Sequence, residues 1–404
     1  MCGNTSSGGQ MQSVCAPDDA LHPLLSCVSL CPGGPLIPYK TTICRVKNSS
    51  IHRILIIRFS SIGDIVLTTP VIRAVRNALP HVRLDFLTKR IFAELLQTNP
   101  HLDHLYTYDH EQSDQKLWKL GALLRENRYD LCIDLHNNLR SHLFRQLIRP
   151  RKTVAYSKQI LRRTLLVKTG VSCYRRIIQV PDRYLKTLAP FGVRGDEQGL
   201  ELFPTEQHDA HVQAIFQREH LRQDELVIGL GPTASFPLKQ WPTEKFIALG
   251  AQLVRHDRAR LIIFGGPQDR DMGASIASQL PNAPIVLCGN VSLLESAAAL
   301  TRCAVFVGND TGLVHIAAAM RTPVVVMFGP TSEELGFYPY HAQSSEICTS
   351  LPCRPCTHTG KGRCRIRETH ACMQRIPVEK VREEVRRMIR EKEKYIDNAL
   401  NVKQ

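Results

Sequence analysis

Two aspartates, each within two residues of a glycine in a short turn after an apolar run, are the residues of this sequence best placed for chemistry. Asp64 closes the segment Phe59-Ser-Ser-Ile-Gly-Asp64, and Asp310 opens the segment Asp310-Thr-Gly-Leu-Val-His315. In open parallel sheets, ligands collect at the carboxyl ends of strands, where helix N-termini point backbone N–H groups at anions. One such turn in each half of the chain therefore predicts two similar domains with a cleft between them.

Asp64 has the chemistry of a general base. A carboxylate within hydrogen-bond reach of a reacting hydroxyl typically contributes about 10²–10⁴ in rate, and a position at the start of a helix favours its ionised form. The same position suits a helix cap, which is a structural role. Ser60, Ser61 and Gly63 are small enough to let a bound molecule approach the turn closely, so we expect them to contact it.

The second turn is suited to an anionic ligand. Backbone N–H groups of a helix that opens at Thr311 and Gly312 can bind a diphosphate. Asp310 would repel phosphate, so we expect it to accept hydrogen bonds from hydroxyl groups of the ligand. His315 lies one turn into this helix and is as consistent with a core histidine as with a residue that orients the loop.

Lys239 lies in a polar loop just before Trp241-Pro242. A cation there can neutralise a leaving diphosphate without a divalent ion, because stabilising the charge that develops in the transition state often contributes more to catalysis than any other effect. A lone lysine is more often a surface residue. Thr233 and Ser235, which follow the strand expected at 226–230, are candidates for hydroxyl contacts to the phosphates.

Strand-like and helix-like patterns alternate from residue 51 onward, which predicts α/β domains with parallel sheets covered on both faces. The expected strands are 54–59, 83–88 and 131–135, then 226–230, 260–264, 284–287, 305–307 and 324–328. No G-x-G-x-x-G fingerprint follows the first strand, and the chain has no Walker A sequence. These absences argue against a dehydrogenase and a P-loop enzyme.

A chain of 404 residues suits two domains, which we place at 51–215 and 224–376. Residues 1–50, rich in Ser, Gly, Pro and Cys, are expected to be a disordered extension and make a poor signal peptide. Residues 377–404 carry an amphipathic helical pattern. No apolar run reaches the roughly 18–20 residues that span a bilayer, so we expect a cytoplasmic protein.

The formal charge of +15 is concentrated in one region. Between Arg140 and Lys186 the chain has thirteen Lys or Arg residues and a single acid, Asp182. Such a surface is either merely solvated or attracts an anionic partner. The region lacks aromatic residues interleaved for base stacking, so we expect no nucleic acid and favour a phosphorylated glycolipid at an anionic membrane. The candidate acceptor-binding side chains are Arg162, Arg163, Arg175 and Arg176.

Fourteen cysteines in a long chain without a signal peptide indicate free thiols or metal ligands rather than disulfides. Four of them form a C-x₂-C-x₇-C-x₇-C pattern, namely Cys353, Cys356, Cys364 and Cys372. This pattern fits a structural zinc, but it fits a cysteine-rich loop without metal as well.

Four segments in order give the chain a resemblance to a known family. They are Phe59-Ser-Ser-Ile-Gly-Asp64, Lys239-Gln-Trp-Pro242, Phe264-Gly-Gly-Pro267 and Asp310-Thr-Gly-Leu-Val-His315. Over residues 51–380 the chain resembles the ADP-heptose:lipopolysaccharide heptosyltransferases of glycosyltransferase family 9. The resemblance implies a GT-B fold of two facing Rossmann-like domains, and a C-terminal helix that packs back on the first domain.

It also implies an activity, which is inverting transfer of a heptose from ADP-heptose to the inner core of lipopolysaccharide at the inner membrane. Asp64 would be the base, and no cofactor would be required for catalysis. Gln268 stands where relatives usually have a glutamate that meets the ribose, which puts the nucleotide preference in question. Val291 falls where the family packs backbone against adenine. The alternatives are a GT-B transferase for another nucleotide sugar and a non-catalytic GT-B protein that binds a glycan or a nucleotide.

Overall fold

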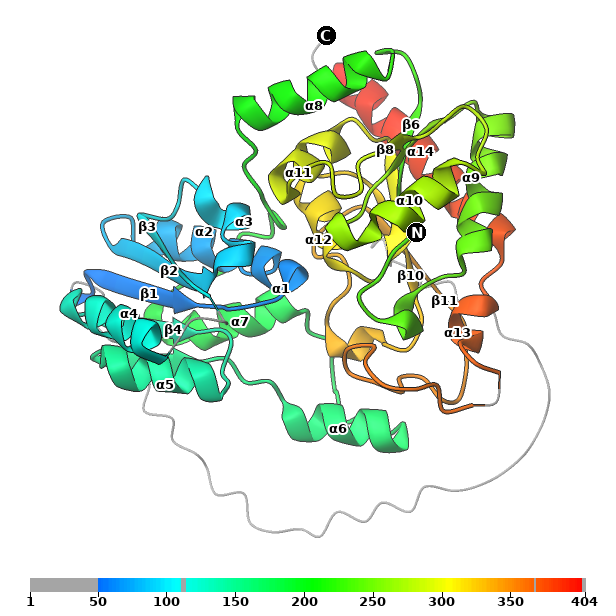
Figure 1. Cartoon of the computed structure of the whole chain (residues 1–404). Helices are drawn as coiled ribbons and strands as arrows, with labels where there is room; N and C mark the ends of the chain where they lie inside the picture. The colour runs from blue at the N-terminus through cyan, green and yellow to red at the C-terminus, as the bar shows by residue number, and fades with distance from the viewer. Residues whose placement is uncertain (1–49, 110–113, 367, 402–404) are drawn as a thin grey trace, which may run out of the picture. The chain divides into compact units, whose positions relative to one another are not determined.

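The computed structural model describes residues 50–109, 114–366 and 368–401 (Figure 1). The expectation for residues 1–50 therefore lies outside the described residues, except at Ser50. The described residues form two α/β domains, each built on one parallel sheet, as the sequence predicts. All of them belong to one compact unit.

The first domain contains a five-stranded sheet in the order β3-β2-β1-β4-β5, and every neighbouring pair is parallel. Its strands are β1 (Arg53–Ile57), β2 (Arg83–Lys89), β3 (His104–Tyr108), β4 (Leu131–Asp134) and β5 (Lys152–Ala155). The sequence did not predict β3 and β5. Both are edge strands with few buried side chains, so they lack the continuous apolar run that marks a central parallel strand.

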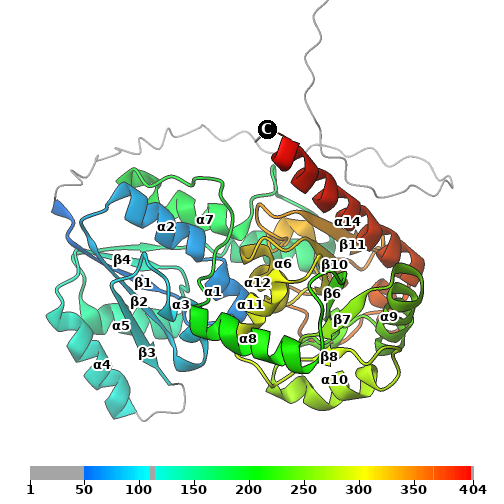
Figure 2. The same ribbon diagram turned by 90° about the horizontal axis from the view of Figure 1, so that it is seen from above.

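Alternating side chains of β1 face two different layers. The helices of this domain are α1 (Ile62–Val66), α2 (Thr69–Ala78), α3 (Glu94–Gln97), α4 (Asp114–Glu126), α5 (Leu139–Ile148), α6 (Ile160–Thr169) and α7 (Val180–Leu188). Ile54 and Ile56 share an apolar cluster with residues of α2 and α7. Leu55 and Ile57 pack with residues of α4 and α5 on the other face. Figure 2 shows this sheet between the two layers of helices.

The second domain is also built on a parallel sheet, which has six strands in the order β11-β10-β9-β6-β7-β8. Its strands are β6 (Val227–Gly231), β7 (Arg260–Ile263), β8 (Ile285–Val286), β9 (Val305–Asn309), β10 (Val324–Phe328) and β11 (Ser344–Cys348). The preceding α8 (Glu206–Arg218) and the domain's own α9 (Thr243–Asp257), α10 (Arg270–Ala277), α11 (Leu293–Thr301), α12 (Gly312–Ala319) and α13 (Ala371–Gln374) complete this part of the chain. Helices α11 and α12 cover one face of the sheet, and α9 covers the other (Figure 2).

The last helix, α14 (Val378–Asn401), packs on the second domain. Val381, Val385 and Met388 belong to the same apolar cluster as β6 and α9. The packing on the first domain that the resemblance implied is therefore wrong for these apolar residues, which instead close the outer face of the second sheet. Within the described part of the chain, no helix combines the length and apolar character needed to cross a bilayer.

Strand order reverses direction beside β1 in the first sheet and beside β6 in the second. Ligands of open parallel sheets bind outside the strand ends at such points. The loops that follow β1 and β4, and those that follow β6 and β9, carry the candidate site residues.

Candidate active site

The carboxylate of Asp64 is held at both of its oxygens. Ser61, the residue before α1, donates its backbone N–H and its hydroxyl to Oδ2, each at 3.0 Å. Nη2 of Arg58 lies 2.6 Å from Oδ1. The side chain of Asp64 remains 20% exposed, and it lines a cavity. Asp64 therefore caps its helix and faces the cavity as well.

Sequence reasoning missed Arg58, which is the partner of Asp64. It is the first residue after β1 and is only 7% exposed. Its Nη1 donates to the carbonyl of Leu135 at 2.6 Å, and its Nε donates to the carbonyl of Ser60 at 2.9 Å. The ring centre of Tyr184 lies 5.9 Å from the guanidinium. The available signal was an arginine directly after a buried strand, a place that an unpaired cation rarely occupies.

Burial and charge act in opposite directions on Asp64. Burial raises its pKa, but the positive charge of Arg58 and the hydrogen bonds from Ser61 outweigh burial, so the pKa lies below the ordinary value of 3.8. Nearby, burial and the charges of Arg58 and Lys158 lower the pKa of His136 to about 3. At neutral pH the cavity therefore presents an ionised Asp64 and an uncharged His136.

Lys239 and Asp310, which the sequence placed in separate roles, form an ion pair. Nζ of Lys239 lies 2.6 Å from Oδ2 of Asp310, and Thr331 donates its hydroxyl to the same oxygen at 3.0 Å. Asp310 thus has protein donors where hydroxyl groups of the ligand were expected to bind. Its charge is balanced before any ligand enters, and it holds Lys239 beside the N-terminus of α12.

Two glycines allow α1 and α12 to meet. A Cβ atom on Gly63 would lie 2.7 Å from Cδ2 of His315, and one on Gly312 would lie 2.6 Å from Cγ2 of Ile62. His315 is 4% exposed, and burial lowers its pKa to about 4. Its Nδ1 has no hydrogen-bond partner among the described residues. His315 is thus a neutral histidine packed at the contact between the two domains.

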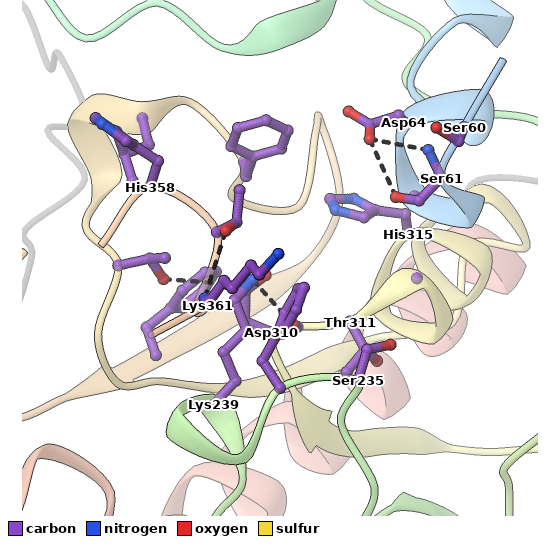
Figure 3. Close-up of a pocket in the computed structure, with 18 of the residues that line it drawn as sticks. Ser60, Ser61, Asp64, Ser235, Lys239, Asp310, Thr311, His315, His358 and Lys361 are labelled. Atoms are coloured by element: carbon purple, nitrogen blue, oxygen red, sulfur yellow. Dashed lines mark hydrogen bonds and ion pairs between the residues drawn. The ribbon is translucent and has the colours of Figure 1, made fainter. Parts of the chain in front are cut away.

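A cavity of about 510 Å³ lies between these loops (Figure 3). The first domain contributes Arg58, Ser60, Ser61, Gly63, Asp64 and His136. The predicted residues that line it from the second domain are Ser235, Lys239, Asp310, Thr311, Gly312 and His315. The structure therefore gathers both aspartate turns, which are far apart in the chain, around one cavity.

Three predicted donor residues do not line this cavity. Thr233 is buried, and its hydroxyl donates to Asp269 at 3.0 Å. Gln268 lies in the turn after β7, and Val291 packs against the apolar cluster beside α11. Arg162, Arg163, Arg175 and Arg176 do not line it either. Burial lowers the pKa of the cavity residue His358. Of these four arginines, Arg163 is close enough to His358 for its positive charge to lower that pKa further.

The loop that carries the cysteine pattern reaches the cavity with His358, Thr359 and Lys361, a role that the sequence analysis did not predict. Gly360, at the tip, has φ +89°, and a Cβ atom there would lie 2.7 Å from Cγ of Lys239. The tip thus covers the aliphatic part of Lys239.

Three of the predicted zinc ligands, Cys353, Cys356 and Cys364, lie in this loop, and the fourth, Cys372, lies in α13. Burial raises the pKa of Cys356, and the nearby thiols of Cys353 and Cys364 raise it further. Across the described ranges, no group of three or more His, Cys, Asp or Glu side chains is arranged to hold a metal ion. The structural zinc stays a prediction of the sequence.

Two parallel-sheet domains with a cavity lined by strand-end loops of both define the GT-B fold. A family model described as glycosyltransferase family 9 (heptosyltransferase) matches residues 117–364. The chain belongs to this family, so the protein is a glycosyltransferase.

Named relatives and solved structures agree with this assignment. Lipooligosaccharide heptosyltransferase 2 of Haemophilus influenzae is 27% identical over 299 residues, which cover 70% of this chain and 84% of the relative. Among solved structures, a family 9 glycosyltransferase from Veillonella parvula superposes with a TM-score of 0.70 at 24% identity, covering 84% of this chain and 97% of that one. The ADP-heptose LPS heptosyltransferase II of E. coli gives a TM-score of 0.65 at 23% identity, covering 84% and 99%.

Proposed function

We propose that the protein transfers a heptose from ADP-heptose to an inner-core acceptor of lipopolysaccharide, with inversion at the anomeric carbon. The names of the relatives support this substrate class, since they are lipopolysaccharide or lipooligosaccharide heptosyltransferases. We place the acceptor, a lipid-linked core precursor, at the cytoplasmic face of the inner membrane, where the protein associates peripherally.

Asp64 is the proposed general base. A carboxylate has about four lone-pair positions, and the donors from Ser61 and Arg58 occupy three of them. The remaining position is on Oδ1, so Oδ1 accepts the proton of the attacking acceptor hydroxyl. As the hydroxyl oxygen bonds to the anomeric carbon, the bond from that carbon to the diphosphate oxygen breaks, and ADP leaves.

The second domain receives the leaving diphosphate. Thr311 precedes α12, whose N-terminal N–H groups are suited to a phosphate. Lys239 lies beside this helix end, where Asp310 holds its ammonium group, and the remaining N–H donors of that group can hydrogen-bond the leaving oxygen as charge develops on it. Lys361 adds a third source of positive potential to the cavity from the cysteine loop. Because these groups supply the positive charge, the chemistry requires no metal cofactor.

One observation carries the proposal: an ionised Asp64 from the first domain and the N-terminus of α12 from the second line the same cavity. The test is to incubate the purified protein with ADP-heptose and a core acceptor, measuring ADP release and the mass of the acceptor glycan. Gain of a heptosyl unit matched by ADP release is expected. ADP release without a heptosylated product would show hydrolysis and would overturn the proposal. Transfer from another nucleotide sugar in preference to ADP-heptose would overturn its donor.

A further inference from the structure

We propose that α6 and the loop after it form a docking surface for an anionic phospholipid bilayer. The docking surface consists of Ile160, Leu161, Arg162, Leu165, Lys168, Val171, Arg175, Arg176 and Ile177. The proposed function explains why the protein would bind a bilayer, and the docking surface rests on it only for that reason. Vesicle binding itself can be measured without any transfer reaction.

Five large apolar side chains are exposed on this surface. Leu161 is 87% exposed and Ile160 is 65% exposed, and Leu165, Val171 and Ile177 are exposed too. Single exposed leucines need no explanation, but a contiguous apolar patch rimmed by charge marks an interaction site. Here the apolar residues alternate with exposed basic ones.

Helix α6 has two distinct sides. Leu166 and Val167 are buried, and Nη1 of Arg365 donates to the carbonyl of Val167 at 2.8 Å, which anchors the helix to the cysteine loop (Figure 1). Leu161, Leu165 and Lys168 follow the i, i+4, i+7 spacing and share the opposite, exposed side. This arrangement leaves the apolar stripe free for an external partner.

The charge of the region identifies that partner. Thirteen basic residues and one acid lie between Arg140 and Lys186. A second copy of this surface would bring like charges together, so self-association here is disfavoured. An anionic bilayer offers negative headgroups to the arginines and an acyl boundary to the leucines, as it does for amphipathic helices that lie in the membrane interface.

Arg162 and Arg163 are neighbours in α6, but the first faces the proposed bilayer and the second lies toward the cavity. Arg162 is exposed on the docking surface, whereas Arg163 is partly buried and close to His358, which lines the cavity. A bilayer bound to the exposed side of α6 would therefore lie next to the cavity rim. A lipid-anchored acceptor could then enter the cavity while its acyl chains stay in the membrane.

The experiment measures cosedimentation of the full chain with vesicles of phosphatidylcholine alone or mixed with phosphatidylglycerol. Binding to the anionic vesicles is expected, with weakening at higher salt because exposed charges are screened. Leu161→Gln with Leu165→Gln should lower the partition coefficient at least about tenfold, since each lost apolar contact is worth roughly that factor. Glutamine keeps helix propensity, so α6 should remain folded.

Trp118→Gln with Leu123→Gln is the matched control, because both side chains are exposed apolar residues on α4. This control should bind vesicles like the unmodified chain. Equal loss in the two double variants, or full binding by the α6 variant, would overturn the docking surface. A homodimer that the α6 substitutions convert to monomer would show that the surface binds a second copy instead. Vesicle binding without any heptosyl transfer would leave the docking surface intact and overturn only the proposed function.

Discussion

The side chains of Arg58 and Asp64 meet at 2.6 Å at the edge of the cavity, where β1 ends. This pairing has two opposing effects on a base. It keeps Asp64 ionised at every physiological pH, and it lowers the basicity of the carboxylate. In the proposed mechanism Arg58 is therefore a positioning residue, because it occupies one lone pair of Oδ1 and leaves the other for the acceptor hydroxyl.

Asp64→Asn should lower kcat by about 10²–10⁴, because asparagine keeps the shape of the side chain and cannot accept the proton. The Kd for ADP should change little, since the donor is assigned to the other domain. Turnover by mass spectrometry and ADP binding by calorimetry separate the two effects. Near-normal turnover would show that Asp64 serves as a helix cap alone.

Arg58→Gln should move the acid limb of the kcat–pH profile to higher pH by about 1–3 units, the usual effect of removing a nearby opposite charge. The sign follows from the pairing: Asp64 must be ionised to act, Arg58 holds its pKa below 3.8, and burial raises that pKa once Arg58 is gone. Arg58→Lys, which keeps the charge, should show a smaller shift. An unshifted profile in the glutamine variant would contradict the role of Arg58.

Gly360→Ala should raise the KM for the donor, because the new Cβ would lie 2.7 Å from Lys239 and displace its ammonium group. Gly362→Ala is the matched control: Gly362 also has a positive φ, +126°, and no described atom lies within 4 Å of a Cβ placed there. Both variants carry backbone strain of about 1–3 kcal/mol, but only the first touches Lys239. Equal donor KM values in the two variants would mean that the loop tip does not support Lys239.

Charge reversal at the arginines should separate acceptor capture from membrane binding. Arg163→Glu is expected to raise the KM even for a delipidated, water-soluble acceptor, since Arg163 lies near His358 at the cavity. Arg162→Glu, alone or with reversal of Arg175 and Arg176, should raise it only for a vesicle-embedded acceptor. Affinity for ADP should be unchanged in all of them. Parallel losses for donor and acceptor would indicate a folding defect.

A chelator should leave the initial transfer rate nearly unchanged, because protein groups supply the positive charge around the diphosphate. Activity that is lost at once and restored by magnesium would contradict the role of Lys239. The predicted zinc is checked separately by metal analysis and by thermal unfolding. A zinc site at the four cysteines predicts roughly one ion per chain and a lower Tm after prolonged chelation.

The sequence predicted the central strands and both aspartate turns because each depends on local pattern. A buried parallel strand is an apolar run, and a phosphate turn needs glycine at a helix start. The edge strands β3 and β5 lack that run, and their place in the sheet comes from pairing with β2 and β4.

The missed site residues depend on contacts over long sequence separations. Lys361 reaches the cavity from a loop whose cysteines suggested metal binding, and Thr331 bonds Asp310 across the end of β10. Arg58 gave a local signal, but only the fold shows that its partner is Asp64. The prediction that α14 packs on the first domain was wrong for its described apolar residues. An amphipathic pattern defines an apolar face but does not indicate which domain covers it.

The close contact at Gly63 and Gly312 fixes the spacing between α1 of the first domain and α12 of the second. The side chains of His315 and Ile62 pack directly against the backbone of these two glycines, closer than any Cβ atom would allow, so the distance between α1 and α12 is fixed by this contact. Variation that adapts such an enzyme to a new acceptor would then accumulate at the rim, in the cysteine loop and α6. An alanine at either glycine would change this spacing and so affect turnover of every substrate to a similar degree.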